Sequence, residues 1–155
     1  MKFVVVSDNH GLVDLLNSIR LMHQDADAFI HCGDSEMTEY QLSGWASVEG
    51  NNDYYADLPL SRILNINGFK VFVTHSHKFS YFNRNERMVE QALKEGCQMV
   101  CFGHTHVFFD DVLDGVRLLN PGSLRYNRDG SKPCYAIVTV DVENYRNISI
   151  ERITV

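Results

Sequence analysis

Five short polar clusters contain side chains of the types that bind divalent metal ions, and each cluster follows a short apolar run. The clusters are Asp8-Asn9-His10, Gly33-Asp34, Gly50-Asn51-Asn52-Asp53, His75 and Gly103-His104-Thr105-His106. Apolar runs of about 4 to 8 residues, separated by helix-like segments, indicate the buried strands of an α/β protein. Functional groups in such folds gather at the carboxyl ends of the strands. We therefore expect these Asp, Asn and His side chains to converge on one edge and to form a two-metal site.

The pattern of apolar residues predicts the elements that position these clusters. The expected helices cover residues 12–24 and 84–95, with a short helical piece near 36–42. The first half of the chain alternates strand and helix, and the second half is mostly antiparallel strand. This order predicts an α/β fold of two packed sheets flanked by helices. The expected strands are 3–6, 28–31, 46–48, 61–66, 70–74, 99–102, 107–113, 116–119, 134–140 and 148–155.

Length and charge restrict the classes of protein that fit. A chain of 155 residues fits one domain, residues 1–155. The net charge of −6 argues against nucleic acid as a partner, because phosphate backbones are bound by patches of Lys and Arg. No apolar run approaches the length of a membrane span, and the N-terminus lacks the apolar core of a signal peptide. We therefore expect a cytoplasmic protein without a membrane partner, and a homo-oligomer stays open.

The cysteines and the aromatic residues near the clusters are predicted to be structural. The four cysteines form no CxxC pair and show no disulfide-like spacing, so we expect small buried side chains rather than a thiolate metal site. The aromatic residues following the clusters could stack on a base or contact a partner, but packing in the core or at the rim is expected. The residues concerned are Cys32, Cys97, Cys101, Cys134, Tyr54, Tyr55, Phe79, Tyr81 and Phe82.

Taken one at a time, most of the polar clusters also have structural explanations. Asp8 could cap the helix that follows it, and Gly33-Asp34 could simply form a turn. The two histidines of the cluster at 103–106 are more informative, because they would point in different directions and could serve different metal ions. The chain has seven histidines, and five of them lie in or just after strand ends. Their joint, ordered occurrence favours the metal site.

The order D-x-H, G-D, G-N-x-D, H and G-H-x-H resembles the calcineurin-like metallophosphoesterases over essentially the whole chain. The short length and the segment Asn120-Pro121-Gly122-Ser123 are similar to the small single-domain YfcE-type phosphodiesterases. The resemblance implies a four-layer α/β/β/α sandwich of two mixed sheets flanked by helices, with a dinuclear metal centre. One metal ion would be held by Asp8, His10, Asp34 and His106. Asp34 would bridge to a second ion, held also by Asn51, His75 and His104.

This ligand set predicts metal-dependent hydrolysis of a phosphate ester. Oxygen and imidazole ligands without thiolate suit Mn²⁺, Fe, Zn²⁺ or Ni²⁺, and we expect two Mn²⁺ ions first. The four positive charges of two ions exceed the charges of Asp8 and Asp34, so the centre attracts phosphate. Ions about 3.5 to 4 Å apart can activate a bridging hydroxide as nucleophile and clamp the phosphoryl oxygens. The expected substrate is a small phosphodiester, and no protein nucleophile is required.

One position departs from the family pattern. Many relatives carry a histidine, thought to help protonate the leaving group, where this chain has Asn52. An amide cannot act as a general acid near neutral pH, so acid help would come from elsewhere, such as His77. A hydrogen bond from His77 to a neighbouring ligand is an equally good explanation of that residue. Asp53 is expected to orient a ligand, and His31 to be a packed imidazole.

Two other functions compete with the phosphodiesterase. A metal-binding protein-interaction scaffold of the same fold is favoured by Asn52 and by the absence of an obvious arginine clamp. A nuclease would need a basic groove, which the sequence lacks. Because all the expected ligands are retained, catalysis is the favoured function.

Overall fold

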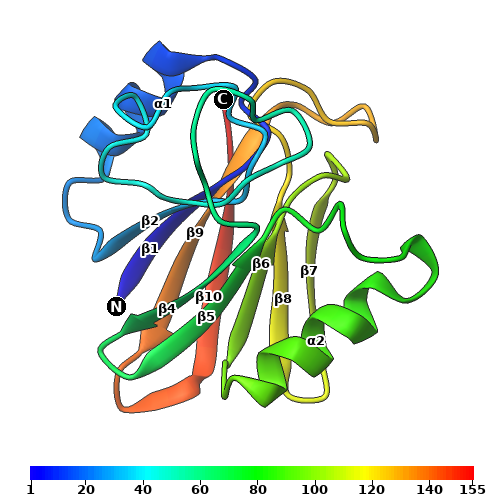
Figure 1. The fold of residues 1–155 in the computed structure, drawn as a ribbon. Helices are drawn as coiled ribbons and strands as arrows, with labels where there is room; N and C mark the ends of the chain where they lie inside the picture. Colours follow the sequence, from blue (N-terminus) through cyan, green and yellow to red (C-terminus); the bar gives the residue numbers. More distant parts are fainter.

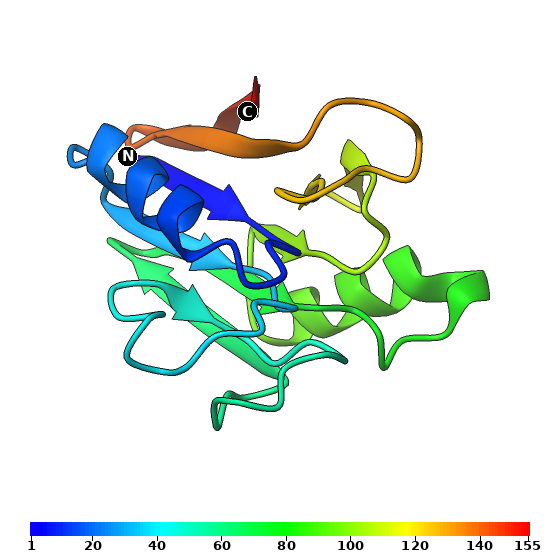
Figure 2. The same ribbon diagram turned by 90° about the horizontal axis from the view of Figure 1, so that it is seen from above.

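A computed structural model describes residues 1–155 and arranges them in two five-stranded sheets. The strand orders are β10-β9-β1-β2-β3 and β4-β5-β6-β8-β7. Helix α1 lies on the outer face of the first sheet and α2 on the outer face of the second (Figures 1 and 2). These four layers confirm the predicted α/β/β/α sandwich. The elements are β1 (Lys2–Val6), α1 (Val13–Met22), β2 (Ala28–His31), β3 (Ala46–Ser47), β4 (Ser61–Ile66), β5 (Phe69–Thr74), the 3₁₀ helix η1 (Tyr81–Asn83), α2 (Arg84–Lys94), β6 (Met99–Phe102), β7 (Phe108–Leu113), β8 (Val116–Pro121), β9 (Cys134–Asp141) and β10 (Asn144–Thr154).

Strand β1 shows why the central strands are apolar without interruption. Successive side chains of a strand point to opposite faces of its sheet. Phe3 and Val5 join the core between the two sheets, whereas Val4 and Val6 join the outer cluster that contains Leu16 of α1. Both faces of β1 are therefore covered, and four consecutive apolar residues are completely buried.

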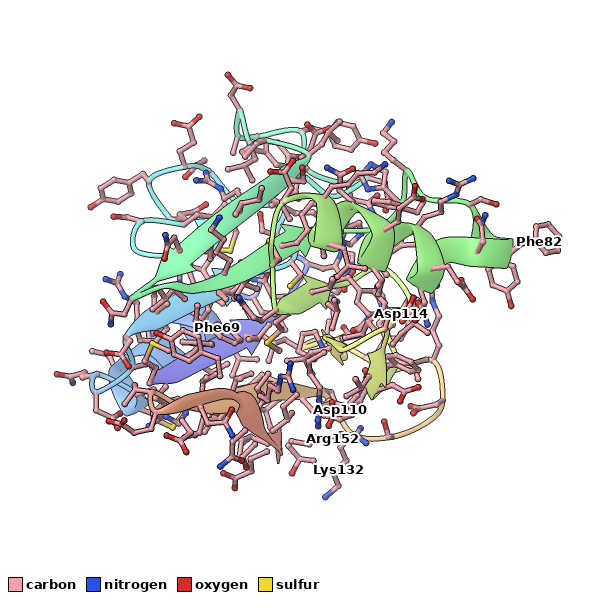
Figure 3. The ribbon with its side chains drawn as sticks, turned by 90° about the horizontal axis from the view of Figure 1, so that it is seen from below. Phe69, Phe82, Asp110, Asp114, Lys132 and Arg152 are labelled. Carbon is pink, nitrogen blue, oxygen red and sulfur yellow. The ribbon has the colours of Figure 1, made fainter.

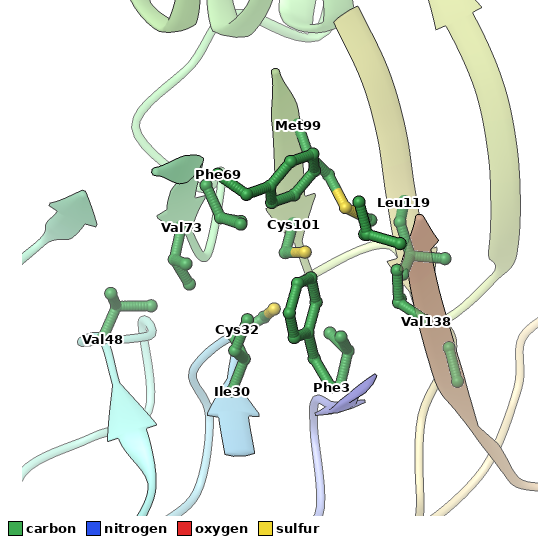
Figure 4. Packing of buried hydrophobic residues seen from close by; sticks show 14 residues of the cluster. Phe3, Ile30, Cys32, Val48, Phe69, Val73, Met99, Cys101, Leu119 and Val138 are labelled. Carbon is green, nitrogen blue, oxygen red and sulfur yellow. The ribbon is translucent and has the colours of Figure 1, made fainter. Parts of the chain in front are cut away.

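Both sheets contribute side chains to the hydrophobic core that lies between them. Figure 4 shows Phe3 and Ile30 of the first sheet facing Phe69, Met99 and Cys101 of the second. The rings of Phe3 and Phe69 lie 5.7 Å apart between their centroids. All four cysteines are free and buried, as predicted. Burial raises the pKa of the Cys101 thiol well above its ordinary value, which keeps this side chain an inert part of the core.

The second sheet is covered by α2, whose end the sequence predicts correctly. Met88, Val89 and Ala92 of this helix pack against the outward-facing residues of β5, β6 and β8. The helix stops before Gly96, which has a φ of +69°. A left-handed residue after the last turn is what a glycine permits at low cost. Neither of the two helices of the sandwich has the length and apolar content required to cross a membrane.

Two expectations differ from the structure, one for the segment near residues 36–42 and one for the aromatic residues beside the polar clusters. Residues 36–38 are irregular and residues 39–44 form turns, where a helix was expected near 36–42. Glu36 has a φ of 53°, and its amide is held by Asp53 at 2.8 Å, so the chain does not start a helix there. Tyr54, Tyr55, Tyr81 and Phe82 are exposed rather than packed. Figure 3 shows Phe82, which is 94% exposed, pointing away from the body of the protein. The second half is mostly antiparallel strand, as predicted, with the exception of β6, which pairs in parallel with both β5 and β8.

Parallel pairing decides where the loops of the sandwich meet. β1 runs parallel to β2, and β2 runs parallel to β3. In the other sheet β5 and β6 are also parallel. The chain segments that follow these strands therefore emerge at a shared edge (Figure 1), and these are the segments that contain the polar clusters.

Candidate metal centre

The structure brings together all seven residues that were predicted to ligate metal ions. They lie in five loops, after β1, β2, β3, β5 and β6, and the loops after β1 and β6 each supply two of them. Main-chain hydrogen bonds join the first two of these loops, from Asp8 N to Gly33 O at 3.0 Å and from His10 N to Asp34 O at 3.2 Å. The seven residues are Asp8, His10, Asp34, Asn51, His75, His104 and His106.

Five of these residues have left-handed backbone conformations. The φ angles are 53° at Asp8, 43° at His10, 55° at Asp34, 72° at His104 and 56° at His106. A non-glycine residue held in this region costs about 1 kcal/mol or more. Such strain persists only where the surroundings enforce it, and it concentrates at functional sites. Here it turns short side chains toward one another at the ends of their strands.

A first group of donor atoms consists of Asp8, His10 and His106. His106 Nε2 lies 3.1 Å from Asp8 Oδ1, and His10 Nε2 lies 3.9 Å from the same oxygen. The two Nε2 atoms are 3.3 Å apart. Asp8 Oδ1 is buried and accepts no hydrogen bond. A buried carboxylate oxygen without a partner is costly, and a divalent cation among these three donors would satisfy it.

A second group of donor atoms contains Asp8 again, with Asp34 and His75. His75 Nε2 lies 3.5 Å from Asp34 Oδ2 and 3.9 Å from Asp8 Oδ1. Asn51 Oδ1 adds to this group, 3.2 Å from His75 Nε2 and 3.0 Å from His104 Nδ1. Asp8 therefore belongs to both groups of mutually close ligand atoms, whereas Asp34 belongs to one.

Three of the histidines are oriented as metal ligands usually are. A ligating imidazole donates one ring N–H to an oxygen, which leaves the other nitrogen free to bind the ion. In each of the three rings Nδ1 contacts such an oxygen, so that Nε2 points into the site. The oxygens are Cys32 O for His75 at 2.7 Å, Tyr126 O for His106 at 3.1 Å and Glu36 Oε1 for His10 at 2.6 Å.

The charges of the site affect one another strongly. Burial opposes ionisation of Asp8 and Asp34, but the neighbouring imidazoles outweigh it and lower the pKa of both carboxyls. Burial also opposes protonation of His75, and the two carboxylates reverse this effect and raise its pKa. Burial and then the charges of His75 and Arg84 lower the pKa of His104 to about 4. The site therefore combines ionised carboxylates with a neutral His104 that can act as a ligand.

Asp53 connects the loops after β2 and β3. Its Oδ2 accepts hydrogen bonds from the main-chain N–H groups of Asp34 and Gly50, both at 2.8 Å. Its Oδ1 accepts from Ser35 Oγ at 2.9 Å and from Glu36 N at 2.8 Å. A carboxylate with four donors is fully satisfied and has no free oxygen for a metal ion. Asp53 thus holds the backbone of Asp34 in place.

Asn52 contacts Asp34 directly. Its side-chain Nδ2 donates to Asp34 Oδ2 at 2.7 Å, and its main-chain N–H donates to Asp34 Oδ1 at 2.8 Å. The position at which the resembled family pattern has a histidine thus holds an amide that orients a carboxylate. The sequence motif shows that Asn52 lacks an imidazole, but nothing in the sequence predicts its hydrogen bonds to Asp34.

The two remaining histidines of interest have different surroundings. His31 is completely buried, with Nε2 2.9 Å from Asn9 Oδ1 and Nδ1 accepting from Gly33 N at 3.1 Å. This confirms the prediction of a packed imidazole. The His77 ring centroid lies 5.4 Å from that of His75, and its buried Nδ1 has no hydrogen-bond partner. Burial, and then the charges of His75 and Lys78, lower the pKa of His77, which is therefore neutral near pH 7.

A cavity of about 410 Å³ opens over the site and contains residues that the sequence analysis missed. Arg125, Tyr126 and Arg128 come from the loop after β8, and Glu36 comes from the loop after β2. Two arginines therefore accompany the site, although no arginine clamp is obvious in the sequence. The only signal in the sequence was the turn at residues 120–123, which precedes both arginines. The cavity is lined by His10, Asp34, Glu36, Asn51, Asn52, His104, His106, Arg125, Tyr126 and Arg128.

Gly103→Ala is expected to disrupt this site. A Cβ at Gly103 would overlap Ser7 Oγ and lie 3.0 Å from Asp8 Oδ2, so the Ser7–Asp8 hydrogen bond of 2.6 Å would be displaced. We expect metal affinity to fall by about 10- to 100-fold, as when an outer-shell partner is lost. Calorimetric titration with Mn²⁺ measures the change. Gly130→Ala is the control, because it has a strained φ of +77° but no atom near its Cβ. Unchanged affinity in Gly103→Ala would contradict the described geometry.

The fold and the site together define a class of protein. A four-layer sandwich that gathers carboxylate, amide and imidazole donors from five strand ends is the architecture of a metallohydrolase. The sequence model of the calcineurin-like phosphoesterase superfamily domain matches residues 1–143. The chain belongs to that superfamily, as its motifs predicted.

Three similar proteins illustrate the relationship. A probable metallophosphoesterase of Bacillus subtilis, YsnB, is 35% identical over 144 residues, covering 91% of this chain and 85% of the relative. The phosphodiesterase MJ0936 of Methanocaldococcus jannaschii is 26% identical over 174 residues, covering 97% of this chain and 100% of the relative. The crystal structure of a predicted phosphoesterase from Streptococcus pneumoniae superposes with a TM-score of 0.88 at 28% identity, covering 99% of this chain and 88% of that chain.

Proposed function

We propose that this protein is a metal-dependent phosphodiesterase with a dinuclear metal centre. The observation that supports this function best is the buried Asp8 Oδ1, which lacks a hydrogen bond and lies among ligand atoms of both groups. One ion would be held by Asp8, His10, Asp34 and His106. The other would be held by Asp34, Asn51, His75 and His104. The Asp8 carboxylate lies close to the donors of both groups, so its charge would stabilise both ions. Two divalent ions supply a water activated for attack and charge to stabilise the phosphoryl oxygens.

The chain's own residues would position the ions and the substrate. The Nδ1 contacts of His10, His75 and His106 keep their Nε2 atoms directed inward. Asn52 and Asp53 would fix Asp34, one through its side chain and one through its backbone. The reacting phosphate would enter through the cavity above the site.

The donor set indicates which ions and substrates to test first. Neither group of ligand atoms includes a cysteine, and oxygen with imidazole suits Mn²⁺, with Fe, Zn²⁺ or Ni²⁺ as alternatives. A diester is proposed because a relative that spans nearly the whole chain bears the name phosphodiesterase. A small diester would fit the cavity of about 410 Å³.

Hydrolysis of bis(p-nitrophenyl) phosphate tests this function. We expect turnover with Mn²⁺ and loss of essentially all turnover when chelator removes the ions, because no protein group replaces the metal-activated water. Release of p-nitrophenol and elemental analysis of the same samples measure both quantities. Full activity in metal-free protein would overturn the proposal. Two bound ions without hydrolysis of any diester would instead support the non-catalytic scaffold.

A further inference from the structure

Arg125 and Arg128 have no anionic partner within the protein. Neither arginine takes part in an ion pair. The Arg125 guanidinium contacts only His10 O, at 3.4 Å, and the Arg128 guanidinium contacts only His104 O, at 3.5 Å. Both distances are at the long limit for hydrogen bonds. The planar donor groups are therefore almost wholly free to bind a ligand.

The loop that contains the two arginines is fixed to the candidate metal centre. Ser123 Oγ accepts from the N–H groups of Arg125 and Tyr126, at 3.0 and 3.1 Å, and donates to Asp8 O at 2.9 Å. Arg128 N donates to His106 O at 2.9 Å. The starting points of both side chains are thus set by the residues that would hold the ions. Such pre-organisation lowers the cost of binding a ligand.

The two arginines line the same cavity as the candidate ligands, and each lies beside a different proposed ligand. Arg125 lies beside His10, and Arg128 lies beside His104. The one carboxylate of the cavity outside the proposed ligands, Glu36, is occupied by His10 Nδ1 at 2.6 Å. Asp129, the acidic neighbour of Arg128 in the chain, directs its carboxylate to Ser131. No acidic group therefore competes for the two guanidinium groups.

Charge indicates what these arginines bind. The positive charge of two divalent ions would be offset by the carboxylates of Asp8, Asp34 and Glu36, by a metal-bound hydroxide and by the single charge of a diester. Two guanidinium groups are then left without an anion. A phosphate monoester carries about −1.5 to −2 charges at pH 7, and its oxygens match the planar donors of arginine.

We propose that Arg125 and Arg128 form a subsite for a second phosphate group, carried by the same substrate as the reacting diester. This inference rests on the proposed function and narrows its substrate class to small diesters that also bear a phosphate monoester. The diester phosphate would lie at the residues that hold the ions, and the arginine pair would bind the monoester in the same cavity.

Equilibrium binding tests the subsite without turnover. The probes are propane-1,3-bisphosphonate and propylphosphonate, which differ in one anionic group and resist hydrolysis, titrated into Mn²⁺-loaded protein. We expect the bisphosphonate to bind at least about tenfold more tightly, since hydrogen bonds between charged groups are among the strong ones. Arg125→Ala and Arg128→Ala should each remove most of this difference, and added salt should weaken it. Arg146→Ala, an exposed arginine of β10, should retain it. Equal binding of both probes by the wild-type protein would overturn the subsite.

A matched pair of substrates distinguishes failure of the subsite from failure of the function. The pair is p-nitrophenyl 3-hydroxypropyl phosphate and the same diester with a phosphate on its free hydroxyl. We expect a higher kcat/KM for the phosphorylated diester and a loss of this preference, chiefly through KM, in the two arginine variants. Turnover of both diesters without a preference refutes the subsite alone. Failure to hydrolyse either diester refutes the phosphodiesterase, and the binding experiment then still decides the subsite.

Discussion

Asp8→Asn is expected to remove both metal ions and to lower hydrolysis of an aryl diester by about a thousandfold or more. Asp8 Oδ1 is the one ligand atom that lies close to both groups of donors. An amide at this position brings no charge, and its NH₂ group can face the donors in place of an oxygen. Metal ions stabilise the transition state by several kcal/mol, and each 1.4 kcal/mol corresponds to a factor of about ten. Elemental analysis and p-nitrophenol release measure the two effects.

Thermal unfolding with and without Mn²⁺ controls for a folding defect. A ligand that binds only the native state raises the unfolding temperature, so Mn²⁺ should stabilise the wild-type protein and leave Asp8→Asn unchanged. The comparison with Asp34→Asn identifies the bridging residue. The proposed bridge at Asp34 requires that this variant also lose both ions. If Asp34→Asn keeps one ion while Asp8→Asn keeps none, Asp8 is the shared ligand.

Hydrolysis rates are expected to fall steeply as the leaving group becomes poorer, because no protonated imidazole stands at position 52. The Asn52 amide is not acidic near neutral pH, and its Nδ2 donates a hydrogen bond to Asp34. His77 lies beside the proposed ligand His75, with ring centroids 5.4 Å apart, and its lowered pKa leaves it neutral. We expect Asn52→His to accelerate esters of phenol far more than esters of p-nitrophenol. General acid catalysis is typically worth about 10² to 10⁴-fold, so even part of this gain is measurable.

Asn52→Ala is the matched control for this experiment. Both substitutions remove the hydrogen bond of 2.7 Å to Asp34 Oδ2, but only one of them supplies an imidazole. If the two variants change good and poor leaving groups by the same factors, acid help at position 52 is not the missing element. His77→Ala completes the series, since a selective loss on phenol esters would show that a hydrogen bond from this ring assists departure.

The sequence by itself determined the strands and the kinds of ligand. Residues 3–6 of β1 are buried on both faces of the sheet, so all four must be apolar, and this makes the strand recognisable in the sequence. The strand ends at Val6, directly before the polar residues Ser7 and Asp8. The same change from apolar to polar residues marks the ends of β2, β5 and β6. Local composition was therefore sufficient to predict where the site would lie.

Contacts between distant segments decided what local composition did not. Residues 36–42 have a helix-like pattern. However, Asp53 accepts a hydrogen bond from the amide of Glu36 at 2.8 Å, and the segment forms no helix. β6 pairs in parallel with β8 and not with β7, the strand that follows it in the chain. β7 pairs only with β8, on the outer edge of the sheet. Such pairings are selected by the packing of whole sheets, and no window of the sequence contains them.

The outer part of the site belongs to the tertiary structure as well. Arg125 and Arg128 lie in a charged loop after β8, whose sequence is typical of an ordinary solvent-exposed surface. They reach the cavity because Ser123 binds Asp8 O and Arg128 N binds His106 O, across more than a hundred residues in the first case and about twenty in the second. The sequence determined which residues could bind metal ions, because ligand chemistry resides in the side-chain type. The structure alone decided which charges accompany them, because that depends on where the folded loops meet.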